Sequence, residues 1–124
     1  MIVVIGGGPA GIAAAARAAE SGQEVTLVDE SPRAGGQIWR HRERTSLPAV
    51  ARRWLARLDR SGAVVRAGTS VIGVQREDDA FVVTAEHDGK HAALRATQVI
   101  LATGARERFL PFPGWTLPGV IGVG

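Results

Sequence analysis

The sequence contains no cysteine. Disulfides, thiol redox centres, iron–sulfur clusters and thiolate zinc sites are therefore excluded within this chain. The sequence also lacks an apolar run long enough to cross a bilayer, because a spanning helix needs about 20 consecutive apolar residues. Its first residues lead directly into an expected strand and show no signal peptide, so a cytoplasmic location is the default.

The composition fits a single globular domain. The chain has 124 residues, of which 45% are hydrophobic, as is usual for such a domain. The formal net charge is +3, and the high isoelectric point reflects arginine. A basic surface suits an acidic partner or a nucleotide phosphate. Because no nucleic-acid-binding module is recognisable, we expect a solvated, arginine-rich surface and no nucleic-acid or membrane partner.

The N-terminal part of the chain carries the clearest motif. A β-branched run at Ile2–Ile5 predicts a buried strand, and the glycine-rich turn Gly6–Gly11 follows it directly. The alanine-rich stretch Ile12–Ser21 predicts a helix, Val25–Val28 predicts a second strand, and Asp29 ends that strand. This order of elements is that of the fingerprint that binds dinucleotides: a strand, a glycine turn, a helix, a second strand and an acid.

Each residue of this fingerprint has a physical task. Gly6 permits a tight turn, Gly8 lets a pyrophosphate approach the backbone, and Gly11 allows the helix to pack closely on the sheet. Pro9 suits the first helical turn, whose N–H groups and dipole attract phosphates. Asp29 can accept hydrogen bonds from both hydroxyls of a ribose and would repel a 2′-phosphate, which argues against an NADP-type ligand. A glycine turn without ligand is the alternative.

A loop is expected after the second strand, over Glu30–Arg40. It leaves the carboxyl end of that strand, where ligands of open α/β sheets bind. Gly35 and Gly36 let the backbone run close to a ligand, and Gln37 can donate and accept hydrogen bonds beside it. A plain connection is the alternative.

An amphipathic helix is predicted over Leu47–Ser61, with Ser46 as its cap and Gly62 at its end. Trp54 is expected in the core. The residues at helical spacing on the apolar face are Leu47, Val50, Ala51, Trp54, Leu55 and Leu58.

Strands dominate the rest of the chain. A third strand at Ala63–Arg66 is expected to run parallel to the first two, and Val99–Ala102 predicts another buried strand. Between them, Asp88-Gly89 is a hairpin signal. The antiparallel strands predicted there are Ser70–Gln75, Ala80–Glu86 and His91–Ala96. No metal site is expected here, because a hairpin turn separates His87 from His91. The fold class is therefore α/β, a Rossmann-type parallel sheet with an inserted antiparallel β-meander.

Several segments resemble those of a known family. The segments are Val4–Gly11, Gly35–Gln37 and Ala102–Arg106. They are similar to the FAD-dependent pyridine nucleotide-disulfide oxidoreductases, the two-dinucleotide-domain flavoproteins that include thioredoxin reductase. More narrowly, Gly35–Arg40, Ala102–Arg108 and Leu110–Trp115 resemble one branch, the flavoprotein subunits of amino-acid and opine dehydrogenases. That branch includes octopine or nopaline oxidase, hydrogen cyanide synthase, D-hydroxyproline dehydrogenase and the alpha chain of sarcosine oxidase.

The resemblance implies FAD as the cofactor and no metal. The first glycine motif would bind the pyrophosphate, and Asp29, with Glu30 as the adjacent alternative, would hold the adenosine ribose. The paired-glycine loop would follow the flavin side, and backbone just after the third strand, at Ser70 or a neighbour, would contact adenine. The turn Ala102–Gly104, after the last strand, would pack near the pyrophosphate. The implied cofactor-binding residues are Gly6, Gly8, Pro9, Ala10, Gly11, Asp29, Glu30, Gly35, Gly36, Gln37, Ser70, Ala102, Thr103 and Gly104.

The resemblance further implies part of an enzyme, the FAD-binding portion of a flavin-dependent oxidoreductase that oxidises an amino acid or opine-like amine when complete. Disulfide reduction is excluded for the chain itself, because it has no cysteine pair. Family members continue into a second nucleotide domain and a C-terminal FAD segment, which the 124 residues do not contain. We therefore expect residues 1–124 to form the N-terminal part of an incomplete FAD-binding domain.

Two alternatives stay open: a non-catalytic subunit that binds FAD or its ADP moiety, and a module that binds NAD, which shares the ribose and pyrophosphate features. The paired-glycine loop and the Ala-Thr-Gly turn favour FAD. We expect a partner subunit, or self-association through an unfinished sheet edge. No catalytic residue is identified. Arg106, Glu107 and Arg108 follow the last turn, but charged loop residues are usually solvated.

Overall fold

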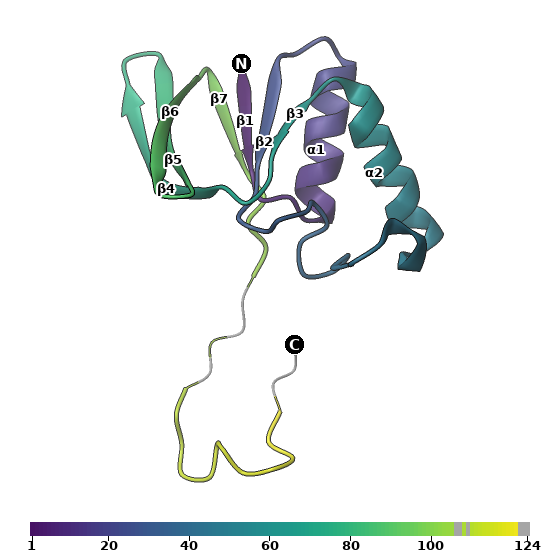
Figure 1. Cartoon of the computed structure of the whole chain (residues 1–124). Coiled ribbons are helices and arrows are strands. Elements are labelled where there is room, and N and C mark those ends of the chain that lie inside the picture. Colours follow the sequence, from purple (N-terminus) through teal and green to yellow (C-terminus); the bar gives the residue numbers. More distant parts are fainter. Residues whose placement is uncertain (106–107, 109, 122–124) are drawn as a thin grey trace.

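The computed structural model describes residues 1–105, 108 and 110–121. Within these residues, a four-stranded parallel sheet has the strand order β3-β2-β1-β7 (Figure 1). Its strands are β1 (Ile2–Ile5), β2 (Val25–Val28), β3 (Val64–Arg66) and β7 (Gln98–Leu101). Every residue of β1 and β2 is buried, as continuous apolar strands of a parallel sheet should be. The predicted strands and their parallel pairing are confirmed. The predicted burial of the last strand is wrong, because β7 lies at the edge of the sheet and pairs, among the described residues, only with β1, and Leu101 is 72% exposed.

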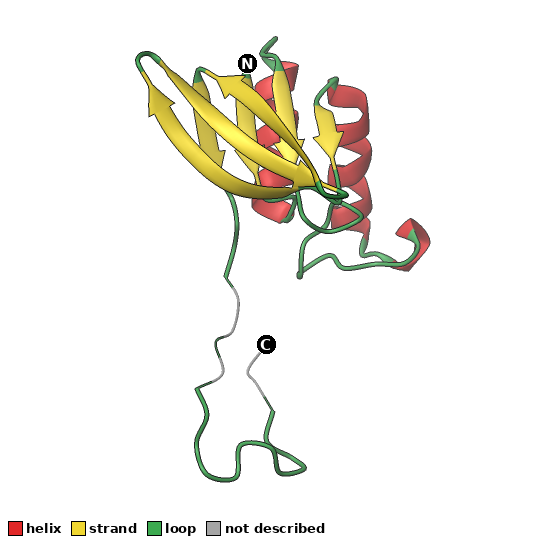
Figure 2. Ribbon diagram, turned by 60° about the vertical axis from the view of Figure 1, so that its left-hand side comes forward, coloured by secondary structure: helices red, strands yellow, loops and turns green. Residues whose placement is uncertain are grey.

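One face of this sheet is covered by α1 (Pro9–Glu20) and α2 (Ala49–Ser61) (Figure 2). Ile12 of α1, Leu27 of β2 and Leu55 of α2 are at most 1% exposed and belong to one core cluster. Full burial of such a side chain contributes about 1.5–3 kcal/mol to folding. In the described part of the chain, no helix is long and apolar enough to cross a membrane.

The opposite face of the parallel sheet carries an antiparallel meander with the strand order β4-β5-β6 (Figure 2). Its strands are β4 (Ser70–Glu77), β5 (Ala80–His87) and β6 (Lys90–Ala96). Val83 and Leu94 of the meander pack in one cluster with Val3 of the central sheet. Asp88 and Gly89, between β5 and β6, have φ values of 49° and 72°, as a type I′ turn requires. The predicted α/β fold class is confirmed.

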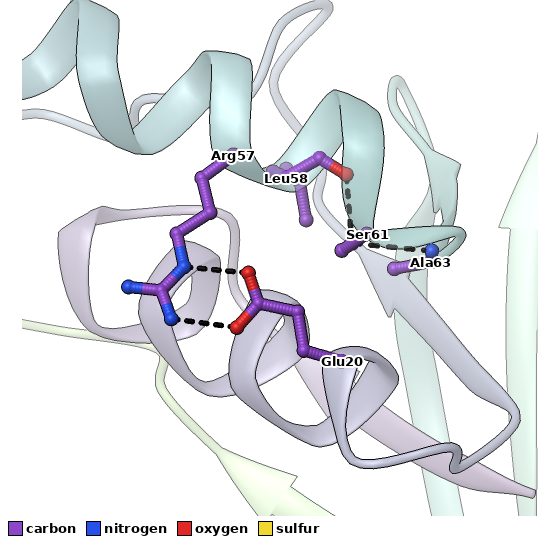
Figure 3. Close-up of polar contacts among 5 residues, drawn as sticks. All are labelled: Glu20, Arg57, Leu58, Ser61 and Ala63. Carbon is purple, nitrogen blue, oxygen red and sulfur yellow. Dashed lines mark hydrogen bonds and ion pairs between the residues drawn. The ribbon is translucent and has the colours of Figure 1, made fainter.

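The two helices are joined by an ion pair at the surface. The Arg57 guanidinium donates two hydrogen bonds of 2.6 Å to the Glu20 carboxylate (Figure 3). These bonds lower the pKa of Glu20 and raise the pKa of Arg57 relative to their ordinary values. The same guanidinium lies 4.8 Å from the ring centroid of Trp54. At the end of α2, the Ser61 hydroxyl donates to the Leu58 carbonyl at 2.7 Å.

Both helices begin at residues other than the first of the stretch predicted to be helical. α1 begins at Pro9, before the alanine-rich stretch from Ile12, and the predicted place of Pro9 in the first helical turn is confirmed. α2 begins at Ala49 instead of Leu47, and its N-cap is Pro48. The residue before a proline is driven out of the helical region, so the helix cannot include Leu47.

Two side-chain predictions for α2 are wrong. Ser46 does not cap the helix: it ends the short 3-10 helix η1 (Arg44–Ser46), where its hydroxyl donates to the Glu43 carbonyl at 2.6 Å. Val50 is 46% exposed instead of buried, and Trp54 is half-buried at the edge of the core. The stripe that α2 buries is therefore narrower than the spacing of apolar residues suggested.

Residues 110–121 extend away from the sheets as a series of turns (Figures 1 and 2). The carbonyls of Phe112, Gly114 and Leu117 each accept a hydrogen bond of 3.0–3.1 Å from the backbone N–H three residues later in the chain. The exposed apolar residues of this segment are Leu110, Phe112, Trp115, Leu117, Val120 and Ile121. Phe109 and residues 122–124 lie outside the described residues.

Candidate functional site

The turn between β1 and α1 has no room for a side chain at Gly6 or at Gly11. Gly6 has a φ of +104°, and a Cβ there would lie 2.7 Å from the carbonyl carbon of Ala102. A Cβ on Gly11 would lie 2.9 Å from the carbonyl carbon of Gly6 and closer still to its oxygen. Both distances are shorter than any real Cβ contact. The predicted conformational tasks of Gly6 and Gly11 are confirmed.

Gly8 differs from these two because a Cβ on it would meet nothing within 4 Å. It is the N-cap of α1, with a φ of −73° that any residue can adopt. No side chain caps this helix end, and its first turn contains no acidic residue. The first four N–H groups of a helix have no acceptor within the helix. The start of α1 therefore presents unsatisfied donors beside open space, which suits an anion.

The paired-glycine loop packs against this turn. The N–H of Gly35 donates to the Gly7 carbonyl at 2.7 Å. A Cβ on Gly36 would lie 2.7 Å from the Cα of Gly8, and Gly36 has a φ of +60°. Only glycine fits so close to a second backbone. The loop thus forms a wall next to the helix N-terminus, and Gln37 lies exposed on it.

Asp29 is buried at the end of β2, with 8% of its surface exposed. Its Oδ2 accepts a hydrogen bond from the N–H of Gly7, and its Oδ1 accepts one of 2.8 Å from the N–H of Ser31. Its backbone N–H donates to the Arg66 carbonyl at 3.0 Å, and its carbonyl accepts the N–H of Thr69 at 2.9 Å. Asp29 therefore connects the glycine turn, the loop after β2 and the segment after β3.

A cleft of about 360 Å³ opens at the carboxyl ends of β1, β2 and β7 and beside the start of β4. This is the edge at which open α/β sheets bind ligands. The predicted residues that line it are Gly6, Asp29, Glu30, Ser70, Thr103 and Gly104. The cleft also includes Thr69, which is 6% exposed and which no pattern in the sequence distinguished from other polar residues.

The remaining predicted residues lie beside the cleft instead of lining it. Gly8, Pro9, Ala10 and Gly11 form the start of α1, and Ala102 extends the β1–β7 pairing by donating its N–H to the Ile5 carbonyl at 2.8 Å. The predicted cofactor residues therefore gather around one end of the parallel sheet. Their contacts with a cofactor stay a prediction.

Of the three charged residues that follow the last strand, the structure describes one. Arg108 is exposed, while Arg106 and Glu107 lie outside the described residues. Among the residues that the structure describes, no group of three or more histidine, aspartate or glutamate side chains could hold a metal ion.

Curated relatives are similar to this chain over nearly all of its length. The hydrogen cyanide synthase subunit HcnB of Pseudomonas protegens is 38% identical over 129 residues, which cover 95% of this chain and 27% of that protein. An opine oxidase subunit of Rhizobium meliloti (strain 1021) is 38% identical over 131 residues, which cover 98% of this chain and 28% of that protein. The chain thus spans about a quarter of the length of these relatives.

Solved structures and a family model agree with this similarity. The L-proline dehydrogenase from P. horikoshii has a TM-score of 0.74 and 29% identity, over 88% of this chain and 23% of that chain. The model of the pyridine nucleotide-disulphide oxidoreductases matches residues 1–123. The resemblance inferred from the sequence is confirmed. Because the match covers nearly all of its residues, this chain belongs to the pyridine nucleotide-disulphide oxidoreductase family.

Proposed function

We propose that this chain is the FAD-binding portion of a flavin-dependent oxidoreductase, which oxidises an amino acid or an opine-like amine when complete. Membership of the family supports a flavin. The names of two relatives, an opine oxidase and an L-proline dehydrogenase, support an amine as the substrate. The observation that carries the proposal is the open space in front of Gly8, at the uncapped N-terminus of α1.

The residues fit the ADP half of FAD. A pyrophosphate in front of Gly8 would accept hydrogen bonds from the first N–H groups of α1 and would meet no side chain. The ribose and adenine would then occupy the cleft, which is lined by Asp29, Glu30 and Ser70. The flavin ring, which supplies the redox chemistry when it is bound, would lie toward the loop that carries Gly36. This chain would position the cofactor and shield its pyrophosphate.

A second candidate is a subunit that binds FAD, or only the ADP moiety, without catalysis of its own. The cleft favours this candidate, because its predicted residues all belong to the ADP end of the site. Relatives named as subunits support a protein partner. NAD as the ligand is the third candidate, since it carries the same ADP moiety.

The test is a titration of the purified chain with FAD, ADP, NAD and FMN. We expect FAD and ADP to bind and FMN to bind more than tenfold more weakly, because FMN lacks the adenosine. If NAD binds and FAD does not, NAD replaces FAD as the ligand and the proposal is wrong. If none of the four ligands binds to the folded protein, the proposed function is wrong for this chain.

A charge variant separates binding from folding. Gly8→Asp places a carboxylate at the N-cap of α1, which stabilises a helix but repels a pyrophosphate. We expect unchanged or higher thermal stability and a loss of FAD affinity of at least about tenfold. Gln23→Asp is the matched control, because it adds the same charge at an exposed position after the other end of α1. Equal affinities of the two variants would contradict a pyrophosphate at Gly8.

A further inference from the structure

A cavity of about 420 Å³ lies between α2, the end of β3 and the loop that follows β2. Of the described residues, none lines both this cavity and the cofactor cleft, so the proposed function makes no use of it. Its volume falls within the range of about 300–1,000 Å³ that small-molecule sites have. Val65 of β3, which is 40% exposed, supplies apolar surface beside the buried Leu55 and Leu58 of α2.

The charged side chains of this cavity are mostly positive. Arg33, Arg42 and Arg44 line it from the loop, whereas Asp59 is the one carboxylate among the described lining residues. Asp59 accepts two hydrogen bonds from Arg44, which raise the pKa of Arg44. In the described part of the chain, neither Arg33 nor Arg42 forms an ion pair. Three guanidinium groups and one carboxylate therefore leave two positive charges uncompensated.

The loop itself holds one of these uncompensated groups in place. Arg33 donates a hydrogen bond from its Nη1 to the backbone carbonyl of Arg42. The chain between them turns back at Gly35, whose φ is +145° and whose carbonyl accepts the N–H of Trp39 at 3.0 Å. Four of the five N–H donors of the Arg33 guanidinium stay available to a ligand. A group that is already fixed loses less freedom on binding, and the planar guanidinium matches carboxylate and phosphate oxygens.

We propose that this cavity, the arginine pocket, binds a small organic dianion, with its two negative charges at Arg33 and Arg42 and its apolar part against Val65. A phosphate monoester and a dicarboxylate share this chemistry. The two uncompensated charges of the pocket match the two charges of the ligand. The inference goes beyond the proposed function and does not depend on it, because no nucleotide takes part.

The test titrates the purified chain with three compounds that carry the same aromatic ring: phenyl phosphate, phthalate and benzoate. At pH 8 the first two are dianions, because the second pKa of a phosphate monoester is about 6, whereas benzoate carries a single charge. Calorimetry should show one site per chain that binds at least one of the dianions about fivefold or more tightly than benzoate. Preference for phenyl phosphate would identify a phosphate monoester as the ligand class, and preference for phthalate a dicarboxylate.

Charge variants then locate the site. Arg33→Gln and Arg42→Gln each remove one uncompensated charge from the pocket, and we expect each to weaken dianion binding about fivefold or more. Arg76→Gln is the matched control, because it removes the same charge from an exposed position of β4 and should change the affinity by less than about twofold. Gly8→Asp, which blocks the proposed pyrophosphate site, should also bind the dianions within about twofold of the wild type.

Three results would overturn the inference: equal affinities for the three compounds, an equal loss in all three arginine variants, or a loss in Gly8→Asp alone, which would place the anion at the start of α1. If Arg33→Gln does not fold, Arg42→Gln decides, because Arg42 contributes only its backbone carbonyl to the bond with Arg33. A folded wild type that binds FAD but no dianion at millimolar concentration overturns this inference and leaves the proposed function standing. The reverse result refutes the proposed function alone.

Discussion

Replacing Gly11 by alanine should destabilise the protein, although alanine is the better helix former. The new Cβ would lie 2.9 Å from the carbonyl carbon of Gly6, whereas ordinary contacts begin at 3.4 Å. It would also lie 3.4 Å from the Cβ of Ala102. The closest atom is the Gly6 carbonyl oxygen, and this oxygen and its carbon both belong to the backbone of the turn, so α1 would have to move away from β1 by about an ångström or more.

The magnitude follows from two opposing effects. Overpacking of this kind costs about 1–3 kcal/mol, and backbone neighbours place Gly11→Ala at the upper end of that range. The higher helix propensity of alanine offsets at most about 1 kcal/mol of this cost. We therefore expect a net loss of about 2 kcal/mol in the free energy of unfolding. In urea, this loss lowers the unfolding midpoint by about 1 M.

The matched control is Gly8→Ala, the same chemical change in the same motif. A Cβ on Gly8 meets nothing within 4 Å, and its φ of −73° is open to alanine. The loss should stay below about 1 kcal/mol, the cost of a poorer N-cap. Urea unfolding followed by circular dichroism measures both variants. Equal midpoints for Gly11→Ala and the wild type would refute the close packing of α1 against the turn.

Three further predictions concern parts of the fold outside the site. Glu20→Gln removes the ion pair with Arg57. Because folding lowers the pKa of Glu20, the wild type should be the more stable protein above the ordinary pKa of this carboxyl. That difference should disappear as the pH falls through the lowered pKa, as melting curves across an acid titration would reveal. Leu55→Ala removes a side chain that is 1% exposed and should cost about 2–5 kcal/mol in urea unfolding, whereas Val50→Ala, at a position 46% exposed, should change stability by less than about 0.5 kcal/mol. Gly89→Ala forces alanine into a φ of 72° and should cost about 1–2 kcal/mol; an unchanged urea midpoint would contradict a type I′ turn.

The strands were predictable because their environment is uniform. β1 and β2 are buried on both faces, so a continuous run of β-branched residues is the expected pattern. The ends of the helices were predictable where glycine marks them. Gly22 and Gly62 both have positive φ, +84° and +85°, just beyond the ends of α1 and α2.

The packing of α2 was harder to predict from spacing. Periodicity indicates the centre of an apolar stripe but not its width, which depends on the neighbouring elements. Ala51, Leu55 and Leu58 face the core and are at most 2% exposed, whereas Val50 lies at the margin of the stripe. The cap at Ser46 was missed for a related reason. Pro48 moves the helix start away from the preceding residues.

Some features of the candidate site follow from residue types in the sequence, and others depend on the register of the strands. The motif predicted an acid at the end of β2 and glycines after β1. It did not single out Gly7, the unspecified position of the motif, whose N–H donates to Asp29. The register pairs Ile5 with Val28 and lets the Gly6 N–H donate to the Val28 carbonyl at 2.8 Å, which brings the turn after β1 beside Asp29. Since a short side chain reaches only the amides that the register brings to it, the sequence can name the acid, while the structure is needed to show that its carboxylate accepts the N–H groups of Gly7 and Ser31.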